Sequence, residues 1–187
     1  ILEARASRRA IDAEGLKVRS WVKPGTAIAL LVDRSGSMGG KPLATSAMAA
    51  AAVAWRSPED YSVIAFGKDV VVAKGQTSTK SGEQVVNDVL ALRGFGTTDL
   101  AGALLAAGDQ LSRTRAGRRI TVILSDCRAT VEGDVQAAAR ALDEVVILAP
   151  LGDDAEARVL ASQVGARIAC IDGPSDIPSA LQTVLGD

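Results

Sequence analysis

The sequence predicts an α/β protein with a doubly wound, Rossmann-like sheet of mostly parallel strands and helices on both faces. Short β-rich runs alternate with longer alanine-rich runs from residue 26 to the end of the chain. Several short runs are continuously apolar, which is typical of strands that are buried on both faces. The length of 187 residues fits one domain of ordinary size.

Each run predicts one element. The expected strands are TAIALLV (26–32), YSVIAF (61–66), DVVVA (69–73), ITVILS (120–125), EVVILAP (144–150) and ARIACI (166–171). The expected helices cover residues 42–55, 82–92, 99–113, 133–142, 153–165 and 175–185. Only Gly67 and Lys68 separate the second strand from the third, so the third should be an antiparallel edge strand. We expect residues 1–25 to be a partly extended lead-in and residues 26–187 to form the domain.

Composition narrows the possible functions. The chain contains no histidine, which excludes Ser-His-Asp and Cys-His catalysis and most zinc sites. The net charge is −1 and aromatic residues make up 3%, so neither nucleic acid nor an anionic membrane is an expected partner. No apolar stretch reaches the roughly 18 residues that a membrane span needs. The first strand is not followed by a glycine-rich phosphate-binding motif, which disfavours nucleotide binding.

Several single residues carry weaker expectations. Cys127 and Cys170 form no CxxC pair, so we expect two buried, reduced core residues, as is compatible with a cytoplasmic protein. Trp55 ends an apolar helical run and is expected to pack in the core. The first residue is Ile1 rather than methionine, so we expect an excised piece of a longer protein.

Polar motifs follow the predicted strand ends. Asp33, Ser35 and Ser37 come directly after the first strand, and Asp126 ends the strand ITVILS. The segment GFGTTDL (94–100) opens the helix that follows it. Because the carboxyl ends of parallel strands meet at one edge of a sheet, we expect these motifs to lie close together. Each motif alone also fits ordinary turns and helix caps, with a serine, threonine or aspartate as the N-cap.

Together the motifs supply a set of hard oxygen ligands: Asp33, Ser35, Ser37, Thr98 and Asp126. Hydroxyls and carboxylates without histidine or thiolate suit Mg²⁺, Mn²⁺ or Ca²⁺, and Mg²⁺ is the expected ion. The three hydroxyls are neutral donors, and the carboxylates can bind directly or through water. One coordination position then stays free, and a carboxylate from a partner protein is an attractive ligand for it.

These motifs resemble those of von Willebrand factor A (VWA) domains, which carry a metal-ion-dependent adhesion site (MIDAS). DRSGS matches the D-x-S-x-S signature of that family. GTTDLAGAL is similar to its G-T-x-x-x-x-A-L segment, which implies Thr98, five residues before Ala103, as the ligand rather than Thr97. ILSDCRAT is similar to the strand-ending aspartate segment, which implies Asp126 as the outer ligand. The sequence departs from the family at Cys127, where a glycine is usual, and this departure affects the loop or access to the metal.

The segments VDRSGSMGGKPL, YSVIAF and SDCRAT resemble the chelatase D-subunit and CoxE-like bacterial branch of the family. That resemblance implies a non-enzymatic, cation-dependent protein-interaction module that acts with an AAA+ ATPase of the MoxR or chelatase type. One alternative is a Mg²⁺-dependent phosphoryl-transfer hydrolase with Asp33 as the nucleophile. Another is a structural VWA domain that has lost its partner.

Two residues beside the motifs have two interpretations each. Arg128 either steers an acidic ligand toward the site or is an exposed charge. Asp99 either supports the ligands from behind or caps its helix, where the helix dipole favours an acidic residue.

Overall fold

The computed structural model describes residues 25–35, 42–92 and 96–186. Its sheet has six strands in the order β3-β2-β1-β4-β5-β6. The strands are β1 (Thr26–Asp33), β2 (Tyr61–Phe66), β3 (Val70–Lys74), β4 (Arg118–Leu124), β5 (Glu144–Pro150) and β6 (Arg167–Ile171). Every neighbouring pair is parallel except β2 and β3, so the predicted antiparallel edge strand is confirmed. The expected lead-in at residues 1–24 lies outside the described residues.

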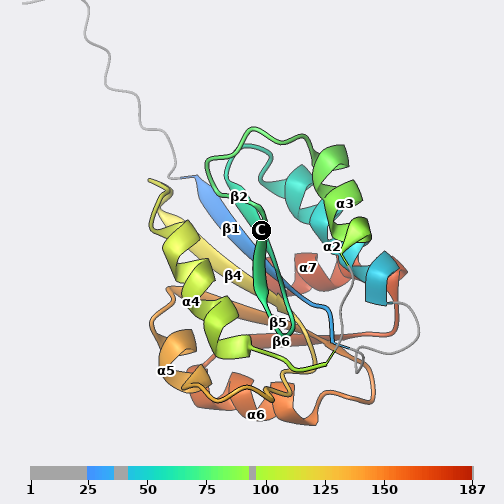
Figure 1. The fold of residues 1–187 in the computed structure, drawn as a ribbon, viewed down its shortest axis with the longest axis vertical. Helices are drawn as coiled ribbons and strands as arrows, with labels where there is room; N and C mark the ends of the chain where they lie inside the picture. Colours follow the sequence, from blue (N-terminus) through green and yellow to red (C-terminus); the bar gives the residue numbers. More distant parts are fainter. Residues whose placement is uncertain (1–24, 36–41, 93–95, 187) are drawn as a thin grey trace, which may run out of the picture.

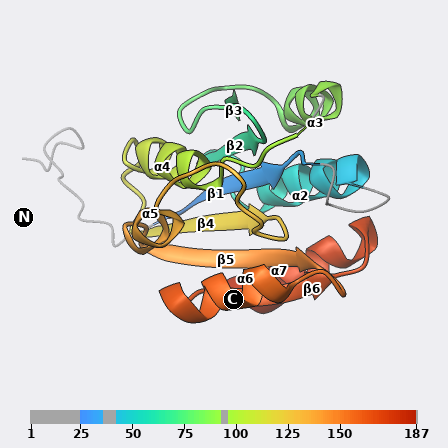
Figure 2. The same ribbon diagram turned by 60° about the horizontal axis from the view of Figure 1, so that its bottom comes forward.

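Helices cover both faces of this sheet (Figures 1 and 2). They are α2 (Pro42–Arg56), α3 (Gly82–Ala91), α4 (Leu100–Leu111), α5 (Val135–Arg140), α6 (Ala155–Val164) and α7 (Ile177–Leu185), with a short 3₁₀ turn, η3 (Pro174–Asp176). The predicted α/β fold is confirmed, and each helix or strand lies within two residues of its predicted bounds. The shortest helix, α5, begins later than expected because the Asp134 side chain caps it by accepting from the Ala137 N–H.

The core has two layers, one on each side of the sheet. Within β1, Ile28, Leu30 and Val32 face the layer that α2, α3 and α7 complete. Ala27, Ala29 and Leu31 face the opposite layer, which α4, α5 and α6 complete. This alternation follows from the two-residue period of a strand, and it explains why a strand covered on both faces is apolar at every position.

The strand order reverses at β1. The chain runs from β1 outward through β2 to β3, and then returns to the other side of β1 as β4. In open α/β sheets such a reversal leaves a crevice beyond the carboxyl ends of the two strands, where ligands bind. Asp33 ends β1 and Asp126 follows β4, so the expectation that they come from neighbouring strands is confirmed.

The prediction that Trp55 packs in the core is wrong, because Trp55 is 88% exposed. Ala49, Ala50 and Val53 form the buried face of α2. Trp55 instead continues the outer stripe of Met48 and Ala52 at helical spacing, and with Pro178 and Leu181 of α7 this stripe lines a surface groove. The helix is apolar around most of its circumference, so its composition did not reveal which face the tryptophan occupies.

The cysteines match their prediction only in part. Both are free, and Cys127 is buried, but Cys170 is only partly buried. Cys170 lies on β6, which is the last strand of the sheet and carries partly exposed residues at most positions. An edge strand lacks a neighbour on one side, so its side chains are less covered. Among the described helices, none has both the length and the apolar character needed to cross a membrane.

Adjacent leucines of α4 give a matched test of the core. Leu104 is 0% exposed and Leu105 is 64% exposed. We expect Leu104→Ala to lower the free energy of unfolding by about 3 kcal/mol, because it removes buried methyl groups and leaves a cavity. Leu105→Ala should change it by less than about 0.5 kcal/mol. Urea denaturation of both variants measures the difference, and equal effects would contradict the packing of α4 on the sheet.

Candidate functional site

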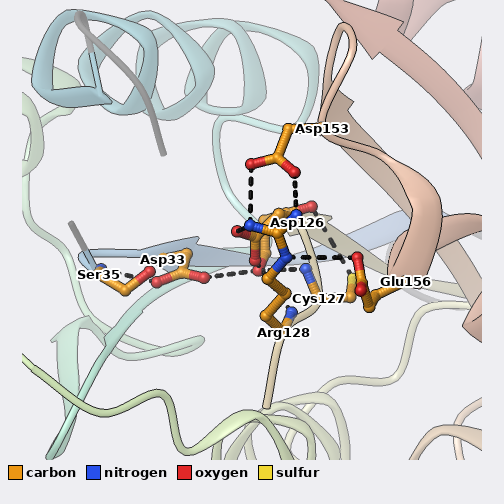
Figure 3. A network of polar contacts seen from close by, with 8 residues as sticks. Asp33, Ser35, Asp126, Cys127, Arg128, Asp153 and Glu156 are labelled. Carbon is orange, nitrogen blue, oxygen red and sulfur yellow. Dashed lines mark hydrogen bonds and ion pairs between the residues drawn. The ribbon is translucent and has the colours of Figure 1, made fainter. Parts of the chain in front are cut away.

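Asp33 lies buried at the carboxyl end of β1, where neutral donors hold both of its carboxylate oxygens. The Ser35 backbone N–H donates to Oδ1 at 2.7 Å (Figure 3). The Ser125 hydroxyl donates to Oδ2 at 2.6 Å. Parallel pairing of Val32 with Leu124 brings Ser125 beside Asp33, so the register of two neighbouring strands creates this contact.

Asp126 is 0% exposed and only partly satisfied. Its Oδ1 accepts the Arg128 backbone N–H at 2.9 Å. Its Oδ2 is buried without a hydrogen bond, and the Arg128 guanidinium (Nη1) lies 3.9 Å from it. A buried polar atom without a partner is costly, and an orphaned carboxylate oxygen is the group that a bound cation would satisfy.

Sequence reasoning missed Ser125, although it links the two aspartates. Its hydroxyl donates to Asp33 and also accepts the Cys127 N–H at 2.9 Å. The only signal in the sequence is a hydroxyl residue at the end of an apolar strand, directly before a predicted ligand. Its role depends on the β1–β4 register, which the sequence does not state.

Cys127 has a left-handed backbone, with φ of +63°. It is the only non-glycine residue with positive φ in the described parts of the chain. Glycine is usual at this position in the VWA domains that the sequence resembles, and the left-handed backbone gives the physical reason, since a side chain makes this conformation unfavourable. Burial and the nearby charges of Asp126 and Asp33 raise the pKa of the Cys127 thiol to about 12, so the thiol stays protonated and weakly reactive.

Thr98 is buried and fixed from two sides. Its backbone N–H donates to the Thr130 hydroxyl at 2.7 Å, and its carbonyl accepts the Thr130 N–H at 3.1 Å, so it is tied to the loop after β4. The next residue, Asp99, donates its N–H to the Gly67 carbonyl at 2.8 Å, just beyond β2. Because β2 and β4 flank β1, these bonds hold Thr98 at the edge where β1 ends. Thr97 is exposed instead.

Asp99 is the N-cap of α4. Its side chain accepts the Gly102 N–H at 2.8 Å. A Cβ atom at Gly102 would collide with this carboxylate, so glycine is needed for the cap. The capping interpretation of Asp99 is therefore confirmed.

The structure describes only one of the two serines in the first motif. Ser35 is 5% exposed and precedes α2 by several residues, so it is not the N-cap of that helix. Ser37 lies outside the described residues, as do the glycines that follow it. Its predicted role as a ligand stays a prediction from the sequence.

The electrostatics of the site favour a cation. Burial raises the pKa of Asp33 above its ordinary value, the charge of Asp126 raises it further, and the bonds from Ser125 and Ser35 act in the opposite direction. Two buried carboxylates that interact unfavourably form a site that a divalent ion would relieve. Among the described residues no three His, Cys, Asp or Glu form a metal-binding group, so any ion here would depend on hydroxyls as well.

Arg128 is not a free charge beside the site. Its guanidinium bonds Asp153 through both Nη atoms and Glu156 through Nε (Figure 3). Neither interpretation of Arg128 from the sequence included these partners, because they lie in the segment after β5 and in the first turn of α6.

Comparison with known proteins identifies the family. The family model of the von Willebrand factor type A domain matches residues 28–129. The chain belongs to this family. The matched range contains both aspartates of the VWA site and the Thr98 loop, and it ends just after Arg128. None of the curated proteins matches the sequence.

Three solved structures share the fold. Proximal thread matrix protein 1 from the mussel byssus, solved with a zinc-occupied MIDAS motif, is 15% identical with a TM-score of 0.69, covering 87% of this chain and 48% of that chain. Manganese-loaded Plasmodium vivax TRAP protein is 14% identical with a TM-score of 0.68, covering 88% and 74%. BatB from Bacteroides thetaiotaomicron is 14% identical with a TM-score of 0.66, covering 86% and 99%. The chain thus spans about half the length of the mussel protein.

The raised pKa of Asp33 predicts a stabilising substitution in the metal-free VWA domain. Above the folded-state pKa the charged carboxylate costs stability, and this cost vanishes as pH falls to the unfolded value of about 3.9. Asp33→Asn keeps an oxygen acceptor for the Ser35 N–H and removes the charge, and its amide N–H faces the Ser125 hydroxyl as the O–H of a protonated Asp33 would. The substitution should therefore raise Tm in EDTA at pH 7. Thermal melts between pH 7 and pH 4 should show this gain shrinking, and a gain that grows on acidification would contradict the assignment.

The left-handed backbone at position 127 predicts that glycine is more stable there than alanine, the reverse of the usual order. Glycine is normally less stable than alanine within folded structure, but φ of +63° favours glycine. We expect Cys127→Gly to be more stable than Cys127→Ala by about 1 kcal/mol in urea denaturation. Both variants remove the thiol, so they differ only in the Cβ methyl group and in the backbone freedom that it limits. The reverse order would show that the loop relaxes out of the left-handed region.

Proposed function

We propose that this VWA domain is a protein-interaction module controlled by a divalent cation. The ligands are the hydroxyls of Ser35, Ser37 and Thr98, with Asp33 and Asp126 binding directly or through water. A carboxylate from an Asp or Glu of the partner protein completes the coordination shell. Partner binding then depends on whether the cation is present.

One observation carries this proposal: Asp126 Oδ2 is buried without a hydrogen bond beside the equally buried Asp33. A purely structural turn would not need two buried carboxylates, because burying charge is expensive unless it is compensated. The location supports the proposal too, since Asp33 ends β1 and Asp126 follows β4, where the sheet order reverses.

The donor chemistry favours Mg²⁺, with Mn²⁺ or Ca²⁺ as other candidates. All donors are hard oxygens, and the set has few charges, which leaves the ion electrophilic toward an incoming carboxylate. A manganese-loaded VWA neighbour and a zinc-occupied one support a divalent ion at this kind of site. Ser37 enters the proposal from the sequence motif alone.

We infer further that the partner belongs to an assembly with an AAA+ ATPase of the MoxR or chelatase type. This rests on the resemblance of SDCRAT and VDRSGSMGGKPL to the chelatase D-subunit and CoxE-like branch. Such an ATPase would place the domain in the cytoplasm, where ATP is available.

Neighbouring threonines test the proposed ligand set. We expect Thr98→Val, which keeps the shape and removes the hydroxyl, to weaken Mg²⁺ binding by at least about tenfold. Thr97→Val removes an exposed hydroxyl from the adjacent residue and should leave the affinity unchanged. Isothermal titration of the full chain with MgCl₂ measures both variants against wild type.

Capture of the partner protein by this domain is measured with the same two variants. Captured protein should be lost in EDTA, return with added Mg²⁺, and be reduced by Thr98→Val but not by Thr97→Val. A wild-type chain that binds no divalent ion, or a Thr98→Val chain that binds as tightly as wild type, would overturn the proposed site.

A further inference from the structure

The guanidinium of Arg128 lies near three carboxylates (Figure 3). Asp126 is buried, whereas Asp153 and Glu156, which we call the outer carboxylates, are partly exposed. An arginine this close to a proposed metal ligand is an obvious competitor for it, because both the ion and the guanidinium are cations.

Within the described residues, the side-chain hydrogen bonds of Arg128 go to the outer carboxylates. Nη1 donates to Asp153 Oδ2 at 3.2 Å, Nη2 donates to Asp153 Oδ1, and Nε donates to Glu156 Oε2 at 3.3 Å. The bond to Asp153 is thus two-pronged, which is the strongest geometry that a guanidinium and a carboxylate form. Toward Asp126 the guanidinium keeps only an ion pair at 3.9 Å.

Asp126 Oδ2 is left unbonded as a result. A direct charge-assisted bond would measure about 2.7–2.9 Å, but here the oxygen has no hydrogen-bond donor although a guanidinium lies 3.9 Å away. Oδ1 of the same carboxylate does receive a bond, from the Arg128 backbone N–H. The backbone of Arg128 therefore orients the Asp126 carboxylate while its side chain is held back from the other oxygen.

The fold places the outer carboxylates where they can hold the Arg128 guanidinium away from Asp126. β5 is the neighbour of β4 in the sheet, so the segments that follow both strands meet at one edge. Asp153 lies in the turn after β5, where its N–H donates to the Pro150 carbonyl at 3.1 Å. Glu156 lies in the first turn of α6.

We propose that Asp153 and Glu156 are positioning residues that hold the Arg128 guanidinium away from Asp126 and keep Oδ2 open to the divalent cation. The inference rests on the proposed metal site and names the residues that tune the affinity of that site for the cation. The three side chains together carry one positive and two negative charges, so a cation approaching the site meets an arginine that is already neutralised. Without Asp153, the guanidinium can turn to Asp126 and compete with the ion.

A double-mutant cycle tests the proposal through Mg²⁺ affinity, measured by isothermal titration of the full chain. Asp153→Asn should weaken binding about tenfold. Arg128→Gln alone should change the affinity by less than about twofold, because the guanidinium is already held back and neutralised in the wild type. In the Arg128→Gln background, Asp153→Asn should change the affinity by less than about twofold, because there is no guanidinium left to release.

The cycle separates positioning from the simple loss of a negative charge. If Asp153→Asn weakens binding equally with and without Arg128, charge alone explains its effect and the proposal is overturned. Asp154→Asn removes the same charge from the neighbouring residue, which pairs with Arg158 instead. This control should leave the affinity near that of wild type, and a loss as large as that of Asp153→Asn would also overturn the proposal.

A spectroscopic readout follows Arg128 itself. In wild type the Arg128 Nε–H resonance should stay in place when Mg²⁺ is added, because the guanidinium already bonds the outer carboxylates. In Asp153→Asn it should shift on Mg²⁺ addition, as the ion displaces the guanidinium from Asp126. The opposite pattern would overturn the proposal. A wild-type chain that binds no Mg²⁺ would instead contradict the proposed function, so the two failures are distinguishable.

Discussion

The hydrogen bond from the Ser125 hydroxyl to Asp33 is the contact on which the site depends. It joins the carboxyl ends of β1 and β4, the two strands between which the sheet order reverses. The same hydroxyl accepts the Cys127 N–H and so shapes the turn that carries Asp126. One side chain thus sets the position of both buried aspartates.

This arrangement stores an electrostatic cost in the metal-free fold. Burial and the charge of Asp126 raise the pKa of Asp33, and one oxygen of Asp126 has no hydrogen bond. The rest of the domain compensates with a two-layered apolar core around β1. A cation bound at the proposed site would recover this cost as affinity.

Two sets of contacts surround the two buried aspartates. Hydrogen bonds to Thr130 and Gly67 hold the Thr98 segment between the flanking strands. The outer carboxylates hold Arg128 at the rim. In the proposed metal site, the hydrogen bonds to Thr130 and Gly67 fix where Thr98 lies, and the outer carboxylates determine how much positive charge an incoming ion would meet.

The sequence by itself determined the order and type of the helices and strands, because apolar periodicity is local and short β-rich runs alternate clearly with longer alanine-rich runs. It also placed Asp33, Thr98 and Asp126 at strand and loop ends that the fold brings to one edge. Tertiary structure alone decided which residues from distant segments meet: Ser125 with Asp33, Arg128 with Asp153, and Trp55 on the outer face of α2. These contacts depend on strand register and helix rotation. Both are set by packing between elements, which the pattern within one element does not contain.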